Sequence, residues 1–177
     1  KRGGTPWDPL DYKREYLDLL WAQIGHRVEG LERGELDPTD YLVPGSLALL
    51  EGLAAAGVTM YLASGTDHPY VVNEARVLGV DRFFGPRIYG AQDDFKTFSK
   101  KMVIDRIIAE NDLHGPEFLA FGDGFVEIED SKGAGGQAVG VASDETGGGE
   151  LDEWKRNRLI QAGADLIIPD YRDAPRL

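Results

Sequence analysis

The chain has 177 residues, of which 42% are apolar and 28% charged, and its formal net charge is −12. This length and balance predict one main folded domain, with room for a small appended unit, and argue against disorder. The acidic charge argues against a protein that binds nucleic acid or an anionic membrane, because both need basic surface. The chain contains no cysteine, which excludes disulfides and zinc–thiolate sites and is typical of a cytoplasmic protein.

Residues 1–43 are predicted to be mostly helical. Asp8 is placed as an N-cap, with Pro9 at the first helical position. The apolar face of this helix is expected to comprise Tyr16, Leu17, Leu20, Trp21 and Ile24.

From Pro44 onward, predicted helices alternate with short apolar strands. The strands are expected at Val58–Ala63, Arg87–Tyr89, Phe118–Phe121, Ala138–Val141 and Asp165–Ile168. The helices are expected near 46–56, 68–79, 100–111, 125–132 and 150–162. Such alternation predicts an α/β fold in which helices cover both faces of a parallel sheet. Ligands then bind beyond the carboxyl ends of the strands, where Ser64, Asp123 and Asp170 lie.

The stretch Gly45–Gly65 carries a single charge, Glu51, and approaches the length of a membrane span. Gly52 and Gly57 interrupt it, and its pattern changes from helical spacing to a continuous apolar run. We therefore interpret it as a helix, a glycine stop and a strand, not as a membrane helix.

The segment FLAFGDGFVEIED, Phe118–Asp130, is an apolar strand that ends in Gly122-Asp123-Gly124 and continues as an acidic helix start. A carboxylate at the tip of a buried strand, beside a glycine that allows a sharp turn, is a common way to present a metal ligand. Packing explains an aspartate between two glycines poorly, which favours a functional role for Asp123. Glu127 lies one helical turn further on, where it could also simply complement the helix dipole.

Ser64 and Lys100 are the candidate phosphate-binding residues. The Ser64 hydroxyl and the backbone N–H groups near Gly65 could hold a phosphate oxygen, although a turn serine is the plain alternative. Lys100 opens a predicted helix, where a cation is mildly unfavourable, which adds weight to a binding role. Its plain alternative is a surface lysine, and Lys101 is a rival for the same role.

In this order, Ser64-Gly65, Lys100 and Gly122-Asp123 with Glu127 resemble motifs II, III and IV of the haloacid dehalogenase superfamily. The resemblance runs from about Pro44 to Asp170 and implies a Rossmann-like parallel sheet flanked by helices. Residues 44–177 would form this core, and residues 1–43 would be part of a helical, C1-type cap. The resemblance further implies that Ser64 and Lys100 bind the transferring phosphoryl group and that Asp123, supported by Glu127, holds Mg²⁺.

Two departures from the superfamily pattern stand out. Glu127 occupies a position where motif IV usually has a second aspartate. Motif I, an Asp-x-Asp element that carries the attacking aspartate and the general acid/base, is not found. The motif I strand normally lies between the strands that end at Ser64 and Asp123, so its absence would leave unpaired strand edges. We therefore expect the chain, which begins at Lys1, to be the C-terminal portion of a longer enzyme.

The expected parent activity is Mg²⁺-dependent hydrolysis of a small phosphate monoester, such as phosphoglycolate or a sugar phosphate, through an aspartyl-phosphate. A phosphomutase or dehalogenase of the same superfamily is the alternative, as is a non-catalytic phosphate-binding α/β module. Receiver domains combine similar residues, but they place an acceptor aspartate before the Ser/Thr strand, and none is found there. His68 could reach a substrate hydroxyl or could be an exposed histidine at a helix start.

Overall fold

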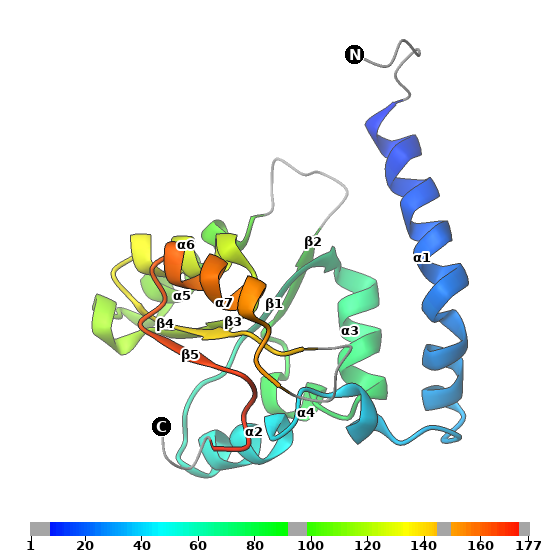
Figure 1. The fold of residues 1–177 in the computed structure, drawn as a ribbon, viewed down its shortest axis with the longest axis horizontal. Helices are drawn as coiled ribbons and strands as arrows, with labels where there is room; N and C mark the ends of the chain where they lie inside the picture. The colour runs from blue at the N-terminus through cyan, green and yellow to red at the C-terminus, as the bar shows by residue number, and fades with distance from the viewer. Residues whose placement is uncertain (1–7, 92–98, 145–149, 174–177) are drawn as a thin grey trace.

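The computed structural model describes residues 8–91, 99–144 and 150–173, which form helices around parallel strands (Figure 1). The strands are β1 (Leu62–Asp67), β2 (Ile88–Ala91), β3 (Leu119–Gly122), β4 (Gln137–Val141) and β5 (Leu166–Ile168). The α-helices are α1 (Pro9–Glu32), α2 (Ser46–Ala55), α3 (His68–Val77), α4 (Asp81–Phe84), α5 (Lys100–Asn111), α6 (Phe125–Gly133) and α7 (Glu153–Gln161). Two short 3₁₀ helices, η1 (Pro38–Tyr41) and η2 (Gly115–Glu117), precede α2 and β3.

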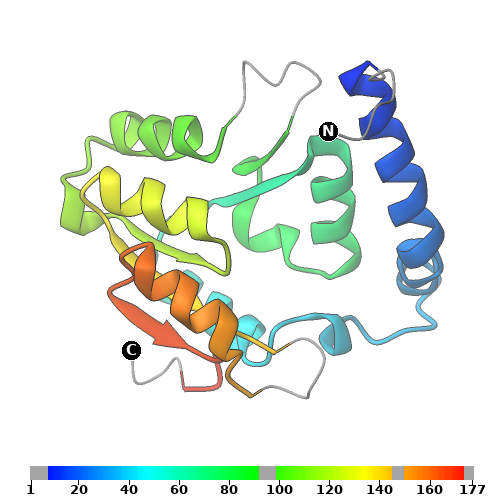
Figure 2. The same ribbon diagram turned by 45° about the horizontal axis from the view of Figure 1, so that its top comes forward.

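The strands of the described residues form two separate parallel sheets. One sheet has the order β1-β2, and the other has the order β3-β4-β5. The two sheets lie next to each other (Figure 1 and Figure 2), yet no described strand pairs with the second edge of β1 or of β3. The α/β architecture with parallel strands and flanking helices confirms the predicted fold class.

Each sheet has its own apolar core. The core of the first sheet is formed by Met60, Val71, Ala75, Val80, Phe84 and Ile88. On one side of the second sheet, a core is formed by Ile128, Ala138, Ala142, Leu159 and Ala162. A further group comprises Val139, Val141 and Ile168, against which Val43, Phe121 and Tyr171 pack. The described residues therefore bury apolar surface in three groups, one at the first sheet and two at the second, rather than across one continuous sheet.

The helix α1 begins as its sequence predicts but turns a different face to the protein. The Asp8 carboxylate accepts a hydrogen bond from the Leu10 amide at 2.9 Å, with Pro9 at the start of the helix. The predicted apolar face is wrong in part, because Tyr16 and Trp21 are 64% and 46% exposed. Among the described residues of α1, the buried ones lie in the second half of the helix, around Val28. Helix α1 also contacts α3. The predicted division of the chain at residue 43 stays a prediction.

The predicted strand Val58–Ala63 is wrong in its bounds. Strand β1 begins at Leu62, whose amide donates to the Arg87 carbonyl, and it continues through Ser64 to Asp67. Residues 58–61 have no neighbouring strand in the described chain, although Met60 is buried among apolar side chains. The apolar run in the sequence therefore identified a buried segment, but the strand itself begins further along the chain, where hydrogen bonds to β2 form.

No helix of the described residues is both long and apolar enough to span a membrane.

Candidate active site

Ser64 lies inside β1, not after it as predicted. Between Ala63 and Asp67 the strand carries four residue steps where β2 has only the two from Tyr89 to Ala91, so the chain bulges there. The Thr66 amide donates to the Ser64 hydroxyl oxygen at 3.1 Å, which closes a small turn at the bulge. Gly65 is exposed and Ser64 is half-buried, so the tip of the turn faces solvent. The arrangement fits a phosphate-binding turn and equally fits the plain turn serine.

The helix α3 starts directly after this turn. Asp67 is its N-cap residue, but the Asp67 side chain makes no capping hydrogen bond. The Asp67 carboxylate instead lies 2.9 Å from the Lys13 ammonium of α1. His68 is the exposed first residue of α3, which agrees with the alternative of an exposed histidine at a helix start. No described contact links His68 to a substrate role.

Lys100 and Glu127 form an ion pair at the start of α5 and α6. The Lys100 ammonium lies 3.1 Å from a Glu127 carboxylate oxygen, with side chains 27% and 19% exposed. Ser99 caps α5 by accepting a hydrogen bond from the Met102 amide at 3.1 Å, which sets Lys100 at the first helical position. The fold thus brings two of the predicted site residues together across 27 positions of sequence.

Lys101, the rival candidate, points elsewhere. Its ammonium lies 2.8 Å from the Asp105 carboxylate on the same helix, and both side chains are exposed. The hydrogen bond that Lys101 donates to the Asp105 carboxylate raises the pKa of Lys101 above its ordinary value. Lys101 therefore pairs on the exposed side of α5, whereas Lys100 pairs with Glu127 of α6.

Asp123 stands in the turn between β3 and α6, and it is exposed. The flanking glycines make room for Glu127: a Cβ at Gly122 would lie 2.6 Å from the Glu127 Cγ, and a Cβ at Gly124 would meet its carboxylate. The Gly124 amide donates to a Glu127 oxygen at 3.0 Å, which caps the start of α6. Glu127 is thus held by both Lys100 and the backbone, while Asp123 is exposed.

The residues present fit a Mg²⁺ site of the kind that uses few protein ligands. Among the described residues, no cluster of three or more His, Cys, Asp or Glu side chains is placed to hold a metal. Mg²⁺, however, commonly uses one or two carboxylates, with water and substrate phosphate oxygens as the other ligands. Asp123 could supply such a carboxylate. Glu127 is already engaged by Lys100 and Gly124, so its carboxylate serves first to position the lysine.

Sequence reasoning missed Tyr171, which lies beneath the Asp123 turn. Its ring packs edge-on against Phe121 of β3, with ring centroids 5.8 Å apart, and its amide donates to the Pro44 carbonyl at 2.8 Å. Burial, together with the nearby Asp123 charge, raises the pKa of Tyr171 to about 12. The only sequence signal was its position just after the last predicted strand.

Asp170, predicted at the carboxyl end of the sheet, is buried and committed to a neighbour. Its carboxylate accepts hydrogen bonds from the Arg172 amide and guanidinium at 2.8 Å. The Arg172 guanidinium holds the pKa of Asp170 below its ordinary value. The Asp170 carboxylate therefore holds Arg172 near the end of the described chain, and it is not free to contact a substrate.

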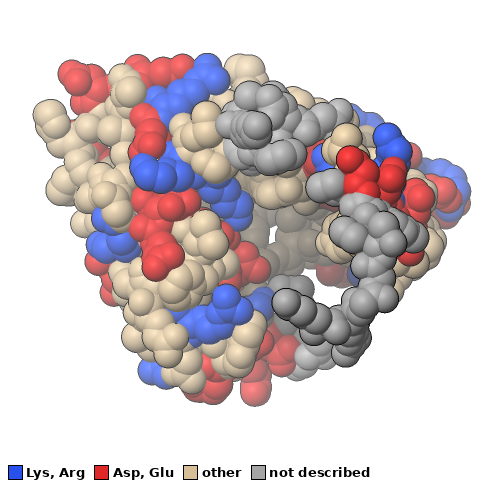
Figure 3. Space-filling view, turned by 90° about the horizontal axis from the view of Figure 1, so that it is seen from above, with Lys and Arg blue, Asp and Glu red and all other residues tan. Residues whose placement is uncertain are grey.

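The described contacts join some of the predicted residues and leave others apart. Lys100 and Glu127 form a pair, and Asp123 adjoins them through the Gly122–Gly124 turn. No hydrogen bond or ion pair between described residues joins Ser64 to Lys100 or Asp123. Figure 3 shows the molecule hollowed at its middle, with acidic and basic side chains mixed along the border of the hollow.

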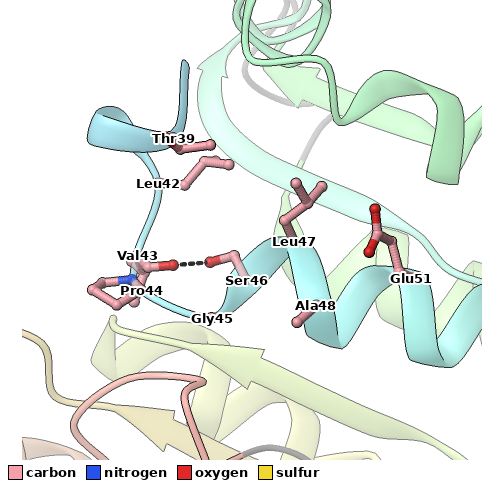
Figure 4. Close-up of a pocket in the computed structure, with 9 residues that line it drawn as sticks. All are labelled: Thr39, Leu42, Val43, Pro44, Gly45, Ser46, Leu47, Ala48 and Glu51. Atoms are coloured by element: carbon pink, nitrogen blue, oxygen red, sulfur yellow. Dashed lines mark hydrogen bonds between the residues drawn. The ribbon is translucent and has the colours of Figure 1, made fainter. Parts of the chain in front are cut away.

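A pocket of about 350 Å³ lies elsewhere, at the start of α2 (Figure 4). Its described lining is mostly apolar, with Leu42 and Leu47 facing it and Glu51 at one side. The Ser46 hydroxyl donates to the Val43 carbonyl at its floor. None of the predicted phosphate or metal residues belongs to this lining.

The chain matches no known protein-family model, and no curated protein matches its sequence. Solved structures do match its fold. A conserved haloacid dehalogenase-like protein of unknown function from Agrobacterium tumefaciens has a TM-score of 0.65 and 19% identity, over 97% of this chain and 69% of its own. A predicted phosphoglycolate phosphatase from Haemophilus somnus has a TM-score of 0.60 and 21% identity, over 76% of this chain and 56% of its own.

A β-phosphoglucomutase from Clostridium difficile has a TM-score of 0.57 and 16% identity, over 82% of this chain and 56% of its own. The chain thus spans little more than half the length of the last two proteins. At these identities the similarity establishes the arrangement of the backbone. The chain has the haloacid dehalogenase-like fold that its motifs predict.

Proposed function

We propose that this chain carries the phosphate-binding and metal-binding half of a haloacid dehalogenase-type phosphohydrolase that acts on a small phosphate monoester. The observation that carries the proposal is the Lys100–Glu127 pair beside Asp123, on a fold shared with phosphatases of this kind. A lysine held next to a strand-tip carboxylate can neutralise a phosphate while the carboxylate supplies a cation ligand.

Each residue has a separate task in this proposal. The Ser64 hydroxyl and the amides of its turn donate hydrogen bonds to the phosphoryl oxygens. Lys100 neutralises their charge, and Glu127 fixes the direction of the lysine. Mg²⁺ would be held by Asp123 and would neutralise phosphoryl charge when bound. None of these groups attacks phosphorus, so hydrolysis needs an additional carboxylate in line with the leaving oxygen.

We propose that this carboxylate comes from a strand seated between β1 and β3. Each of these strands has one unpaired edge among the described residues, and a parallel strand inserted there would join the two sheets. Its carboxylate oxygen would bond to phosphorus as the ester oxygen leaves with a proton from a second aspartate. Water then hydrolyses the aspartyl-phosphate to free phosphate and regenerates the carboxylate.

The test combines residues 1–177 with a peptide whose apolar strand ends in Asp-x-Asp-x-Thr. Phosphate release from p-nitrophenyl phosphate is measured with Mg²⁺, and a peptide with asparagine at both aspartates is the matched control. The chain alone and the control mixture should be silent, whereas the aspartate peptide should give turnover. Turnover from the chain alone would place the nucleophile within it and overturn the proposal.

A phosphomutase is the second candidate, since one protein of similar fold is described as a β-phosphoglucomutase. It would use the same phosphate-binding residues but would pass the phosphoryl group to a sugar hydroxyl instead of water. In the completed protein, conversion of a sugar phosphate to its isomer without net phosphate release would favour this candidate.

A further inference from the structure

The Lys13–Asp67 ion pair joins α1 to the turn that contains Ser64. The ammonium and carboxylate lie 2.9 Å apart, and their side chains are 30% and 16% exposed. By contrast, the Arg76–Glu32 pair, which also joins α3 to α1, has side chains 59% and 41% exposed. A half-buried pair is screened less by salt than an exposed one, so the Asp67 carboxylate holds the Lys13 ammonium beside the turn that contains Ser64.

Asp67 can exchange this partner at small cost. It is the N-cap residue of α3, where a carboxylate normally accepts a hydrogen bond from the first turn of the helix. Its side chain makes no such bond while it contacts Lys13. If Lys13 turned to another anion, the Asp67 carboxylate could cap α3 instead, and that bond would offset part of the lost ion pair.

The bulge in β1 sets the distance between Lys13 and Ser64. The four residue steps from Ala63 to Asp67 lie opposite only two residue steps of β2, from Tyr89 to Ala91. Two strand residues span about 7 Å, so Asp67 is about that far along the sheet from Ala63 and nearer to Ser64. Asp67, which holds the Lys13 ammonium at 2.9 Å, is thus offset along the strand from Ser64. A small molecule that contacts both Ser64 and Lys13 would therefore carry a second anionic group apart from its phosphate.

We propose that Lys13 is a specificity-determining residue, held by Asp67 until a substrate with a second anionic group replaces that carboxylate. This inference rests on the proposed function and names its substrate class: a phosphate monoester that carries a carboxylate or similar anion a few bonds from phosphorus. The substrate anion binds Lys13, and Asp67 turns to cap α3.

The test compares 3-phosphoglycerate with glycerol 3-phosphate, which has a hydroxymethyl group in place of the carboxylate. Binding to the full chain is measured by calorimetry for the unmodified protein, Lys13→Gln and Asp67→Asn. Lys13→Gln should weaken 3-phosphoglycerate about tenfold and change glycerol 3-phosphate little, since an ionic hydrogen bond is lost for one ligand alone. Asp67→Asn should strengthen 3-phosphoglycerate severalfold, because it releases Lys13 from its carboxylate partner and asparagine still caps a helix.

The opposite effects expected for Lys13→Gln and Asp67→Asn distinguish a ligand-binding role of Lys13 from a purely structural ion pair. If the pair were only structural, both substitutions would change 3-phosphoglycerate binding in the same direction, since each breaks the same pair, and that result would overturn the inference. Lys13→Arg keeps the charge and should keep the preference for 3-phosphoglycerate, which guards against loss through misfolding. Arg76→Gln, at the second α1–α3 pair, is the control and should leave the preference unchanged.

The two proposals fail in different ways. If Ser64→Ala and Lys100→Ala leave the binding of both esters unchanged, the proposed phosphate site is wrong, and the inference falls with it. If those variants weaken both esters while Lys13→Gln leaves the preference unchanged, only the role of Lys13 is wrong.

Discussion

The two sheets of this molecule differ in what they contribute to the candidate site. The β1-β2 sheet, with α3 and α4, contributes Ser64, whereas the β3-β4-β5 sheet, with α6 and α7, contributes Asp123 and Glu127. Each sheet packs around its own core and pairs only with its own strands in the described chain. The comparison teaches that the candidate site lies at the junction of the two sheets, so its geometry depends on what holds the two sheets together.

The helix α5 is the main described link between them. At its end, the Asn111 side chain donates to the Tyr61 hydroxyl oxygen at 2.8 Å, just before β1. At its start, Lys100 pairs with Glu127 of α6. Buried Val103, Ile104 and Ile107 lie between these ends. A second link joins Tyr171, after β5, to Pro44, before α2.

The largest expected effects test whether the two cores are separate. Phe84→Ala removes a large side chain from the first core and should cost about 3–5 kcal/mol of stability, and Ile128→Ala in the second should cost about 2–5 kcal/mol. Hydrogen exchange should rise in β1, β2 and α3 for the first variant, and in β3–β5 and α6 for the second. Equal loss of protection in both sheets from either variant would show one cooperative unit and break the comparison.

Lys100→Ala tests the junction itself. In the protein completed by the nucleophile strand, it should lower kcat by about 100- to 1000-fold, because a charge that neutralises the phosphoryl group is lost. The matched control is Lys101→Ala, which should change kcat little, since Lys101 pairs with Asp105 away from the site. A larger loss for the Lys101 variant would reverse the assignment of the two lysines.

Substitutions of Asp123 and Glu127 test whether these two residues of the second sheet have separate roles. Asp123→Asn should weaken apparent Mg²⁺ affinity by about tenfold or more, because the proposed function makes Asp123 a direct metal ligand. Glu127→Gln should affect Mg²⁺ affinity less and phosphate affinity more, since Glu127 contacts Lys100. Titration of Mg²⁺ and of phosphate for both variants measures this, and equal effects on Mg²⁺ would count against separate roles.

The smallest effect concerns Tyr171, at the second link. Because the folded state raises its pKa to about 12 from 10.0, the folded protein holds the phenol proton more tightly than the unfolded chain. Stability from this group is present below pH 10 and is lost as the pH rises toward 12. Between about pH 9 and pH 11, urea unfolding should show about 1 kcal/mol more loss for the unmodified protein than for Tyr171→Phe. An identical pH dependence for both would mean that the ring is not buried at the junction.

The sequence predicted the helices better than the strand edges. Helix α5 has the predicted bounds, because a capping serine and a regular apolar stripe are both local signals. Strand β1 was placed too early, because its bounds depend on pairing with β2, which the apolar run at Val58–Ala63 does not encode. The Lys13–Asp67 ion pair could not be predicted for the same reason, since Lys13 lies on a helix distant in sequence.

The site residues follow this rule. The strand-tip position of Asp123 was predicted from a local pattern, and the structure places Asp123 in the turn after β3. The pairing of Lys100 with Glu127 and the position of Tyr171 under the turn could not be predicted, because both arise from packing between distant segments.

The Gly122-Asp123-Gly124 turn gives this surface a distinct tolerance to mutation. Any side chain at Gly122 or Gly124 would push on Glu127, and through Glu127 would displace the lysine that it holds. Gly52 and Gly133, where an added Cβ would meet nothing within 4 Å, carry no such restriction. In a saturation-mutagenesis library scored for phosphate binding, even alanine should be depleted at the first two codons and accepted at the other two. Glycine is thus the only residue that the position of Lys100 allows at 122 and 124.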